Sequence, residues 1–426
     1  MSVPLLGCIA DDFTGATDLA SNLVEAGMRV VQCFGIPPSL DAIADTDAIV
    51  IALKTRSIDR NEAVRLSLEA LSTLRSFGTT RFYFKYCSTF DSTDQGNIGP
   101  VAEALMKALD VPQSIFCPAF PENVRTLYCG HLFVGNVPLN ESGMKHHPLT
   151  PMTDCNLVRV LSRQTQMQVG SIPFTIVEKG AESIKIALRV LWECGKQMIL
   201  VDTLNNQHLR SIAMACADMP LITGSSGVAI GLPDAYRERG LLSSRPTPPQ
   251  MPRIEGRTAI IAGSCSLATQ EQVAYMQSRC PTRRIDVRKC VAEPEAVIAD
   301  LVGWAFEKDA DLPIVIASTA DAVKVSAVQS ELGTEVVARC VESVLAAIAQ
   351  RLVNECGVRR LIVAGGETAG AVVSMLGIRT LRIGPRIAAG VPWTESLDGP
   401  SLALSLKSGN FGGVDFFQRA IEMLTK

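Results

Sequence analysis

The alternation of short apolar runs with helical patterns most constrains how this chain can fold. Each apolar run has the length of a buried strand, and stretches such as 60–78 and 180–195 keep helical spacing of their apolar residues. Short buried strands that alternate with amphipathic helices are typical of a parallel α/β sheet. The strands predicted in the first half lie within 5–10, 48–53, 81–86, 114–120, 197–203 and 220–227.

A proline-rich stretch divides the chain. The segment SSRPTPPQMPRIEG, residues 243–256, has four prolines and little periodicity, which is typical of a linker. The predicted fold class is α/β, with two α/β domains of mainly parallel sheets, residues 1–242 and 257–426. A two-substrate reaction would place its active site in the cleft between such domains. Beyond the linker the alternation restarts in 258–276, 313–318, 336–357 and 360–376.

Composition favours a small-molecule role. The 426 residues are 47% hydrophobic, enough for sizeable cores, and the formal net charge of −3 gives no support for nucleic-acid binding. The 13 cysteines are scattered without a CxxC pair, as in a reducing compartment. No stretch reaches the roughly 18 apolar residues of a membrane span, and the first residues do not resemble a signal peptide. We therefore expect a cytoplasmic protein with no membrane partner.

Two adjacent carboxylates follow the first predicted strand. In LLGCIADDFTGATDLASNLVEAG, residues 5–27, Asp11, Asp12 and Thr14 lie in a strand-to-helix turn. Such turns at the carboxyl edge of an open α/β sheet are where ligands usually bind. One aspartate is explained as the cap of the following helix, which leaves the second without a structural role.

A second polar group follows the strand at 81–86. It contains Lys85, Tyr86, Asp91, Ser92, Thr93 and Asn97. Such a density of donors and acceptors suits a ligand with hydroxyl or carboxylate groups, with Lys85 neutralising an anion and Asp91 accepting a hydroxyl proton. The alternative is that Ser, Thr, Asp and Asn here only form the loop.

Residues 117–152 combine an Asn-Val-Arg turn, a predicted hairpin and a basic group. Arg125 is a candidate for holding a carboxylate with two hydrogen bonds. His146 and His147 are more typical of a solvated basic loop than of a metal site, because no third histidine is nearby. The metal ligands therefore stay unknown. The GSSG stretch, 224–227, lacks the GxSxG pattern and is interpreted as a turn.

Glycine-rich turns recur in the second half, where they allow a backbone to approach phosphate closely. Lys407 stands beside the last of them. There is no Walker pattern and no GxGxxG, so neither common nucleotide fold is supported by its motif. The candidate nucleotide-binding residues are Ser264, Ser266, Gly365, Gly366, Glu367, Thr368, Gly409 and Gly412.

Six stretches run in order across nearly the whole chain: IADDFTGATDLA, FKYCSTFDSTDQGNIGP, GHLFVGNVPLNESGMKHHPLTPM, GSCSLATQEQV, AGGETAG and GVPWTESLDGPSLALSLKSGNFGGVDFF. Together they resemble the four-carbon acid sugar kinase family. Within the family, KYCSTFDST resembles the branch that acts on the 3-oxo acid, whereas threonate and erythronate kinases carry a shorter K-x-D-S-T form.

The resemblance implies ATP-dependent phosphorylation of the 4-hydroxyl of 3-dehydro-tetronate, with the acid sugar in the N-terminal domain and ATP in the C-terminal one. It implies that Asp11, Asp12, Lys85, Asp91 and Arg125 lie at the sugar end. As a hypothesis, one aspartate orients or deprotonates the attacking hydroxyl and the other caps the helix or reaches Mg²⁺. Asp91 competes with Asp12 for the role of base.

Three alternatives stay open. The nearest is a D-threonate or D-erythronate kinase of the same family. An NAD(P)-dependent oxidoreductase and a non-catalytic acid-sugar sensor are the others, although the missing GxGxxG counts against the first of these. A homo-oligomer is compatible with the sequence, but the sequence does not determine the oligomeric state. It also does not distinguish a D substrate from an L substrate.

Overall fold

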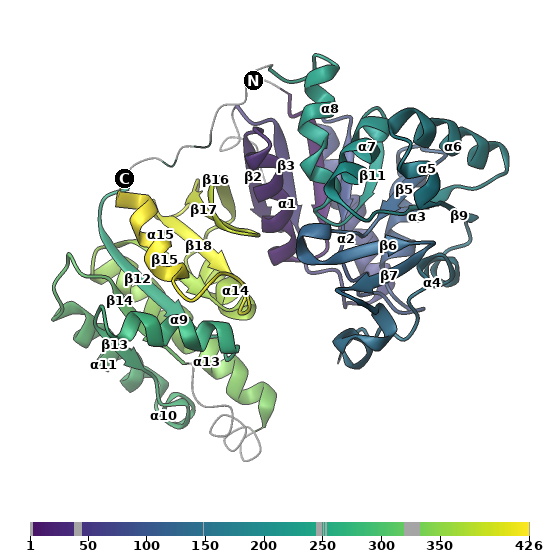
Figure 1. The fold of residues 1–426 in the computed structure, drawn as a ribbon. Coiled ribbons are helices and arrows are strands. Elements are labelled where there is room, and N and C mark those ends of the chain that lie inside the picture. The colour runs from purple at the N-terminus through teal and green to yellow at the C-terminus, as the bar shows by residue number, and fades with distance from the viewer. Residues whose placement is uncertain are drawn as a thin grey trace. The chain divides into compact units, whose positions relative to one another are not determined.

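The computed structural model describes residues 3–37, 45–147, 149–243, 249, 251, 254–318 and 333–425 (Figure 1). It divides into two compact units, Met1–Pro248 and Pro249–Lys426. Most of the predicted linker, namely 244–248, 250, 252 and 253, lies outside the described residues. No helix in the described part of the chain is both long enough and apolar enough to span a membrane.

The first unit is built on a parallel sheet, as predicted. The strands are buried on both faces, which explains why the sequence reads as continuous apolar runs. Their order is β2 (Val30–Phe34), β3 (Ala48–Ala52), β1 (Leu6–Ala10), β4 (Phe82–Lys85), β11 (Leu221–Gly224), β5 (Ser114–Cys117), β10 (Met198–Val201) and β9 (Val169–Ile172).

Helices connect these strands, and the helices predicted at 60–78 and 180–195 are confirmed. They are α1 (Phe13–Glu25), α2 (Arg60–Ser76), α3 (Ile98–Ala108), α4 (Leu157–Gln164), α5 (Phe174–Val177), α6 (Ala181–Glu193), α7 (Asn206–Cys216) and α8 (Leu232–Glu238). Short 3₁₀ turns cover Pro121–Asn123, Leu139–Glu141, Gly143–His146 and Val228–Ile230.

The predicted hairpin is also present. The strands β6 (Arg125–Tyr128), β7 (His131–Val134) and β8 (Val137–Pro138) form a small antiparallel sheet. Leu127 exchanges backbone hydrogen bonds of 2.9 and 2.8 Å with Thr203, which follows β10. The small sheet is thereby attached at the carboxyl edge of the large one.

The second unit combines parallel and antiparallel strands. The parallel part is β13 (Thr282–Arg284), β14 (Ile314–Ala317), β12 (Arg257–Ala262), β15 (Val358–Ala364) and β18 (Ala403–Lys407), and β17 (Val391–Ser396) and β16 (Thr380–Ala388) continue it antiparallel. Its helices are α9 (Leu267–Gln277), α10 (Val287–Ala292), α11 (Pro294–Phe306), α13 (Thr334–Glu355), α14 (Gly366–Met375) and α15 (Phe416–Thr425).

Strand register aligns the turns that carry the candidate residues. In the first unit Ala10 pairs with both Ala52 and Lys85, so β1, β3 and β4 end at one level. In the second unit Ala364 pairs with Ala262 and with Lys407, so β12, β15 and β18 also end together. Each sheet therefore brings its polar turns to one carboxyl edge.

Candidate active site

The two N-terminal aspartates have different contacts. Asp12 is the N-cap of α1, because its Oδ1 accepts a 3.1 Å hydrogen bond from the backbone N–H of Gly15. Asp11 makes no cap and is 5% exposed. The capping interpretation is thus right for Asp12, and a separate partner holds Asp11.

That partner is Arg56, which the sequence analysis did not select. Its Nε and Nη2 donate to the two carboxylate oxygens of Asp11 at 2.9 and 2.8 Å, and Nη2 also donates to Asp12 Oδ1 at 2.6 Å. Asp91 Oδ2 lies 3.7 Å from Nη1. The signal was available in the sequence, because Arg56 is a cation shortly after the carboxyl end of β3.

The environments of the two aspartates shift their pKa values in opposite directions. Burial raises the pKa of the Asp11 carboxyl above its ordinary value, and the nearby Arg56 charge only partly opposes this. Burial also acts to raise the pKa of Asp12, but the charges of Arg56 and Lys85 and the Gly15 N–H outweigh it and lower that pKa. Asp12 is therefore the more readily ionised member of the pair.

Lys85 lies beside Asp12, and its charge helps to lower the pKa of that carboxyl. It is the last residue of β4 and 3% exposed, and no described residue accepts a hydrogen bond from it. A Cβ added at Gly15 would overlap both the Lys85 ammonium and the Asp12 carboxylate. Glycine at this position lets the first turn of α1, which includes Thr14, pack close to both groups.

The loop from Tyr86 to Asn97 is held mainly by its own polar residues. Thr89 Oγ1 donates to Asp91 Oδ1 at 2.6 Å, which orients that carboxylate. Asn97 Nδ2 donates to the carbonyls of Thr55 at 2.7 Å and Ile58 at 3.0 Å, so it ties the loop to the segment that carries Arg56. Tyr86 is fully buried, with its hydroxyl 3.2 Å from Thr223 Oγ1.

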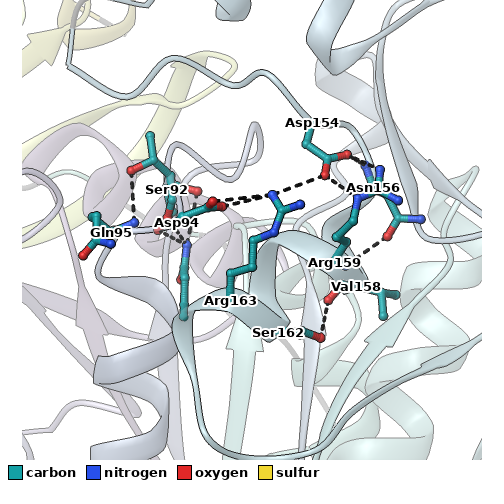
Figure 2. Close-up of polar contacts among 11 residues, drawn as sticks. Ser92, Asp94, Gln95, Asp154, Asn156, Val158, Arg159, Ser162 and Arg163 are labelled. Carbon is teal, nitrogen blue, oxygen red and sulfur yellow. Dashed lines mark hydrogen bonds and ion pairs between the residues drawn. The ribbon is translucent and has the colours of Figure 1, made fainter.

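Helix α4 braces the same loop from outside (Figure 2). Gln164 Nε2 donates to Ser92 Oγ at 2.9 Å and to the Thr93 carbonyl at 2.5 Å. Arg163 Nη1 lies 3.3 Å from Asp94 Oδ1 and 3.7 Å from Asp154 Oδ2 (Figure 2). Ser92 and Asn97, selected as substrate contacts, therefore have side chains occupied in bracing the loop.

No contact within the described residues joins Arg125 to the Asp11, Asp12 and Arg56 cluster. Its guanidinium donates to the Asn123 carbonyl, and its buried Nε has no partner. The described residues contain no group of three or more His, Cys, Asp or Glu suited to a metal ion.

Two other features of this unit have structural roles. His147 Nδ1 accepts from the Thr150 N–H at 3.0 Å within its own loop. Ser225, in the predicted GSSG turn, donates through Oγ to the Ala119 carbonyl at 2.9 Å. Both contacts hold the conformation of a loop.

In the second unit the glycine turns pack closely against one another. Ser266 caps α9, and its Oγ donates to the Gly409 carbonyl at 2.6 Å. A Cβ at Gly409 would overlap Ser264 Oγ, and one at Gly263 would overlap Thr368 Oγ1. Small residues are therefore required where the turns after β12, β15 and β18 meet.

Lys407 lies beneath these turns as a buried cation. It is 1% exposed, and its Nζ donates to Thr269 Oγ1 at 3.1 Å, to the Ser408 carbonyl at 3.0 Å and to the Gly409 carbonyl at 2.8 Å. Burial lowers its pKa to about 8. Gln272 Nε2 holds the rest of the turn by donating to the Gly412 carbonyl at 3.0 Å, where Gly412 has a φ of +80°.

A cavity of about 240 Å³ opens beside the glycine turns. Its polar wall includes Ser264 and the first turn of α14, Gly365 to Thr368, and its apolar wall includes Val337 and Val341 of α13. Backbone N–H groups at a helix start suit phosphate, and an apolar wall suits a flat base. The cavity thus has the chemistry of a nucleotide site.

Comparison with known proteins assigns a class to each unit. Residues 6–232 match the family model described as a sugar-binding N-terminal domain, and residues 259–417 match the nucleotide-binding C-terminal domain. A sugar-binding unit joined to a nucleotide-binding unit defines a sugar kinase of two domains, which uses ATP. The chain belongs to the four-carbon acid sugar kinase family.

Curated relatives and solved structures agree with this membership. A Cupriavidus necator protein named 3-oxo-tetronate kinase is 52% identical over 424 residues, covering 99% of this chain and 97% of its own length. A Salmonella typhimurium protein of the same name is 44% identical over 417 residues, covering 97% of this chain and 98% of its own. A solved structure from Haemophilus influenzae has a TM-score of 0.85 at 40% identity, covering 98% of this chain and 100% of that one.

Proposed function

We propose that this kinase transfers the γ-phosphoryl group of ATP to the 4-hydroxyl of 3-oxo-tetronate, also called 3-dehydro-tetronate, and forms 3-dehydro-tetronate 4-phosphate. The names of relatives that are 44 to 52% identical over nearly the full length of both chains support this substrate. The main structural support for the reaction is the Asp12 carboxylate, which is ionised and is the most exposed of the three carboxylates of Asp11, Asp12 and Asp91. Its side chain is 28% exposed, against 7% for Asp11 and 8% for Asp91.

Asp12 accepts the proton of the attacking 4-hydroxyl in this proposal. A ligand can reach it, whereas both oxygens of Asp11 are occupied by Arg56. Asp91, oriented by Thr89, accepts a hydrogen bond from another substrate hydroxyl. Because phosphoryl transfer needs positioning and charge stabilisation more than covalent help, one ionised carboxylate together with Mg²⁺ and a cation on the transferred group is sufficient.

ATP binds in the second unit in this proposal. Its phosphates lie against Ser264, Ser266, Gly365, Gly366 and Thr368. Gly409 and Gly412 shape the turn after β18, and Glu367 lies beside the ribose. ATP enters as its Mg²⁺ complex. Since magnesium in such sites commonly takes one or two carboxylates together with phosphate oxygens and water, the absence of a larger acidic group among the described residues is compatible with this.

The described residues include all 13 cysteines, and none of them forms a disulfide. We propose on this basis that the enzyme works in the reducing cytoplasm, where ATP is available.

Phosphorus NMR of the product tests the reaction. The purified enzyme, Mg·ATP and 3-oxo-tetronate are expected to yield a phosphomonoester whose phosphorus couples to the protons on carbon 4. A phosphoester at carbon 2, or free phosphate alone, would contradict the proposal.

A further inference from the structure

The guanidinium of Arg56 has one occupied edge and one available edge. Nε and Nη2 make all of its hydrogen bonds, to Asp11 and Asp12. Nη1 carries two further N–H groups, and its nearest carboxylate oxygen, on Asp91, is 3.7 Å away, longer than a hydrogen bond. No residue in the described part of the chain accepts a hydrogen bond from Nη1.

Lys85 presents a second set of unused donors in the same place. Its side chain is nearly completely buried, and none of the described residues accepts from its three N–H groups. An ammonium with no acceptor among the described residues can donate to a ligand. Lys85 and Arg56 both lie close to Asp12. A Cβ at Gly15 would overlap both Lys85 Nζ and Asp12 Oδ1, and Arg56 donates a hydrogen bond to Asp12.

We propose that Arg56 Nη1 and Lys85 Nζ together bind the carboxylate of the acid sugar, so that Arg56 selects an acid substrate while its other edge fixes Asp11 and Asp12. This inference deepens the proposed function and rests on it for the identity of the ligand. A carboxylate is the one anionic group of an unphosphorylated tetronate. The planar Arg fork and a nearby ammonium match its two oxygens.

Most carboxylate oxygens of the neighbouring aspartates already accept hydrogen bonds. Both oxygens of Asp11 already accept from Arg56, and Asp12 Oδ1 accepts from Arg56 and from the Gly15 N–H. Asp91 Oδ1 accepts from Thr89. The acceptors left on this side are Asp12 Oδ2 and Asp91 Oδ2, so a bound carboxylate would have to lie against Arg56 Nη1 and Lys85 Nζ and away from these two oxygens.

The test is a binding measurement without ATP on wild type, Arg56→Lys and Arg60→Lys. Arg60 is the matched control, because it is the first residue of α2 and its guanidinium donates, among the described residues, to Gln95 Oε1 at 3.4 Å and to no aspartate. Calorimetry compares threonate with threonamide and 3-oxo-tetronate with its amide. A charge-assisted hydrogen bond contributes about 1.5–3 kcal/mol. Arg56→Lys should therefore weaken acid binding about 10- to 100-fold and amide binding less than about 3-fold, and Arg60→Lys should change neither.

Three outcomes would overturn the inference. Equal binding of acid and amide by wild type shows that no group of the protein recognises the charge of the carboxylate. Equal weakening of both ligands in Arg56→Lys shows a purely structural role. Unchanged acid binding in Arg56→Lys shows that Nη1 does not bind the carboxylate.

A second variant keeps the test decisive if Arg56→Lys fails to fold, which circular dichroism would reveal. Lys85→Met removes the other half of the proposed site and should also lose the preference for the acid. The proposed function is tested by a separate experiment, the release of ADP by wild type with 3-oxo-tetronate and Mg·ATP, and no release would contradict it. The carboxylate preference is measured without nucleotide, so the two failures are distinguishable.

Discussion

Arg56 holds Asp11 by two parallel hydrogen bonds, of 2.9 Å from Nε and 2.8 Å from Nη2, across 45 residues of sequence. The pair joins the turn after β1 to the segment after β3, and the shared level of these strand ends makes it possible. The same guanidinium reaches Asp12, so one cation fixes both carboxylates of the candidate site.

Breaking this pair should destabilise the first unit. Removing one partner of a largely buried ion pair leaves a charge without compensation, which typically costs about 3–5 kcal/mol. We expect Arg56→Met to lower the free energy of unfolding by about 3 kcal/mol, and Arg56→Met with Asp11→Asn to recover part of that loss. Denaturant unfolding of the single and double variants gives the coupling energy, and simple additivity would show that the pair is not coupled.

Asp12→Asn should separate catalysis from capping. Asparagine is as good an N-cap as aspartate, so α1 should keep its stability. Loss of the ionised carboxylate should lower kcat about 10²- to 10⁴-fold. Steady-state ADP release measures this, with Asp59→Asn, at the N-cap of α2, as the matched control. Unchanged kcat in Asp12→Asn would remove Asp12 from the role of base.

Gly15→Ala should impair the site by sterics alone. The added methyl would overlap the Lys85 ammonium and the Asp12 carboxylate, so one of them must move. We expect kcat/KM to fall at least about 10-fold, since small displacements of positioned groups have large effects on rate. Gly143→Ala is the control, because a Cβ there meets nothing within 4 Å. Equal activity of both variants would contradict the close packing of Lys85 against α1.

Lys407 should make stability depend on pH in the alkaline range. Its pKa is lowered from 10.5 to about 8 by burial, so below pH 8 both folded and unfolded states carry the proton and the cost of burial is fully present. Between pH 8 and 10.5 the unfolded state binds more protons, so the folded state gains stability as pH rises.

Lys407→Met lacks this gain. Between pH 7 and 9.5 the free energy of unfolding of wild type should therefore rise by on the order of 1–2 kcal/mol relative to that of the variant. Denaturant unfolding followed by tryptophan fluorescence detects it, because Trp393 is fully buried in the core of the same unit. A constant difference between the two proteins across this pH range would show that the pKa of Lys407 is not lowered.

The sequence predicts the parallel sheets well because a strand buried on both faces is a continuous apolar run. It does not reveal β9, whose residues Val169–Ile172 include a glycine and a serine. Nor does it reveal β16, where Gly384 and Pro385 interrupt the pattern. These strands owe their place to pairing with neighbours, which local periodicity does not report.

The sequence predicts those residues of the candidate site that lie directly at the ends of predicted strands. Asp11, Asp12 and Lys85 come together because β1 and β4 end at the same level. Arg56 lies four residues beyond the end of β3, at the same edge, and the sequence does not show that its side chain reaches back to Asp11. Residue type alone also does not separate a ligand contact from a brace, as Asn97 shows by bonding to backbone carbonyls.

ADP release with Mg·ATP, measured side by side on 3-oxo-tetronate, threonate and erythronate, tests the central claim most directly. We expect turnover with 3-oxo-tetronate at a kcat/KM far above that of the two hydroxy acids. Turnover mainly with threonate or erythronate would contradict the proposed substrate, and no turnover with any of the three, by a protein that still binds ATP, would contradict the proposed reaction.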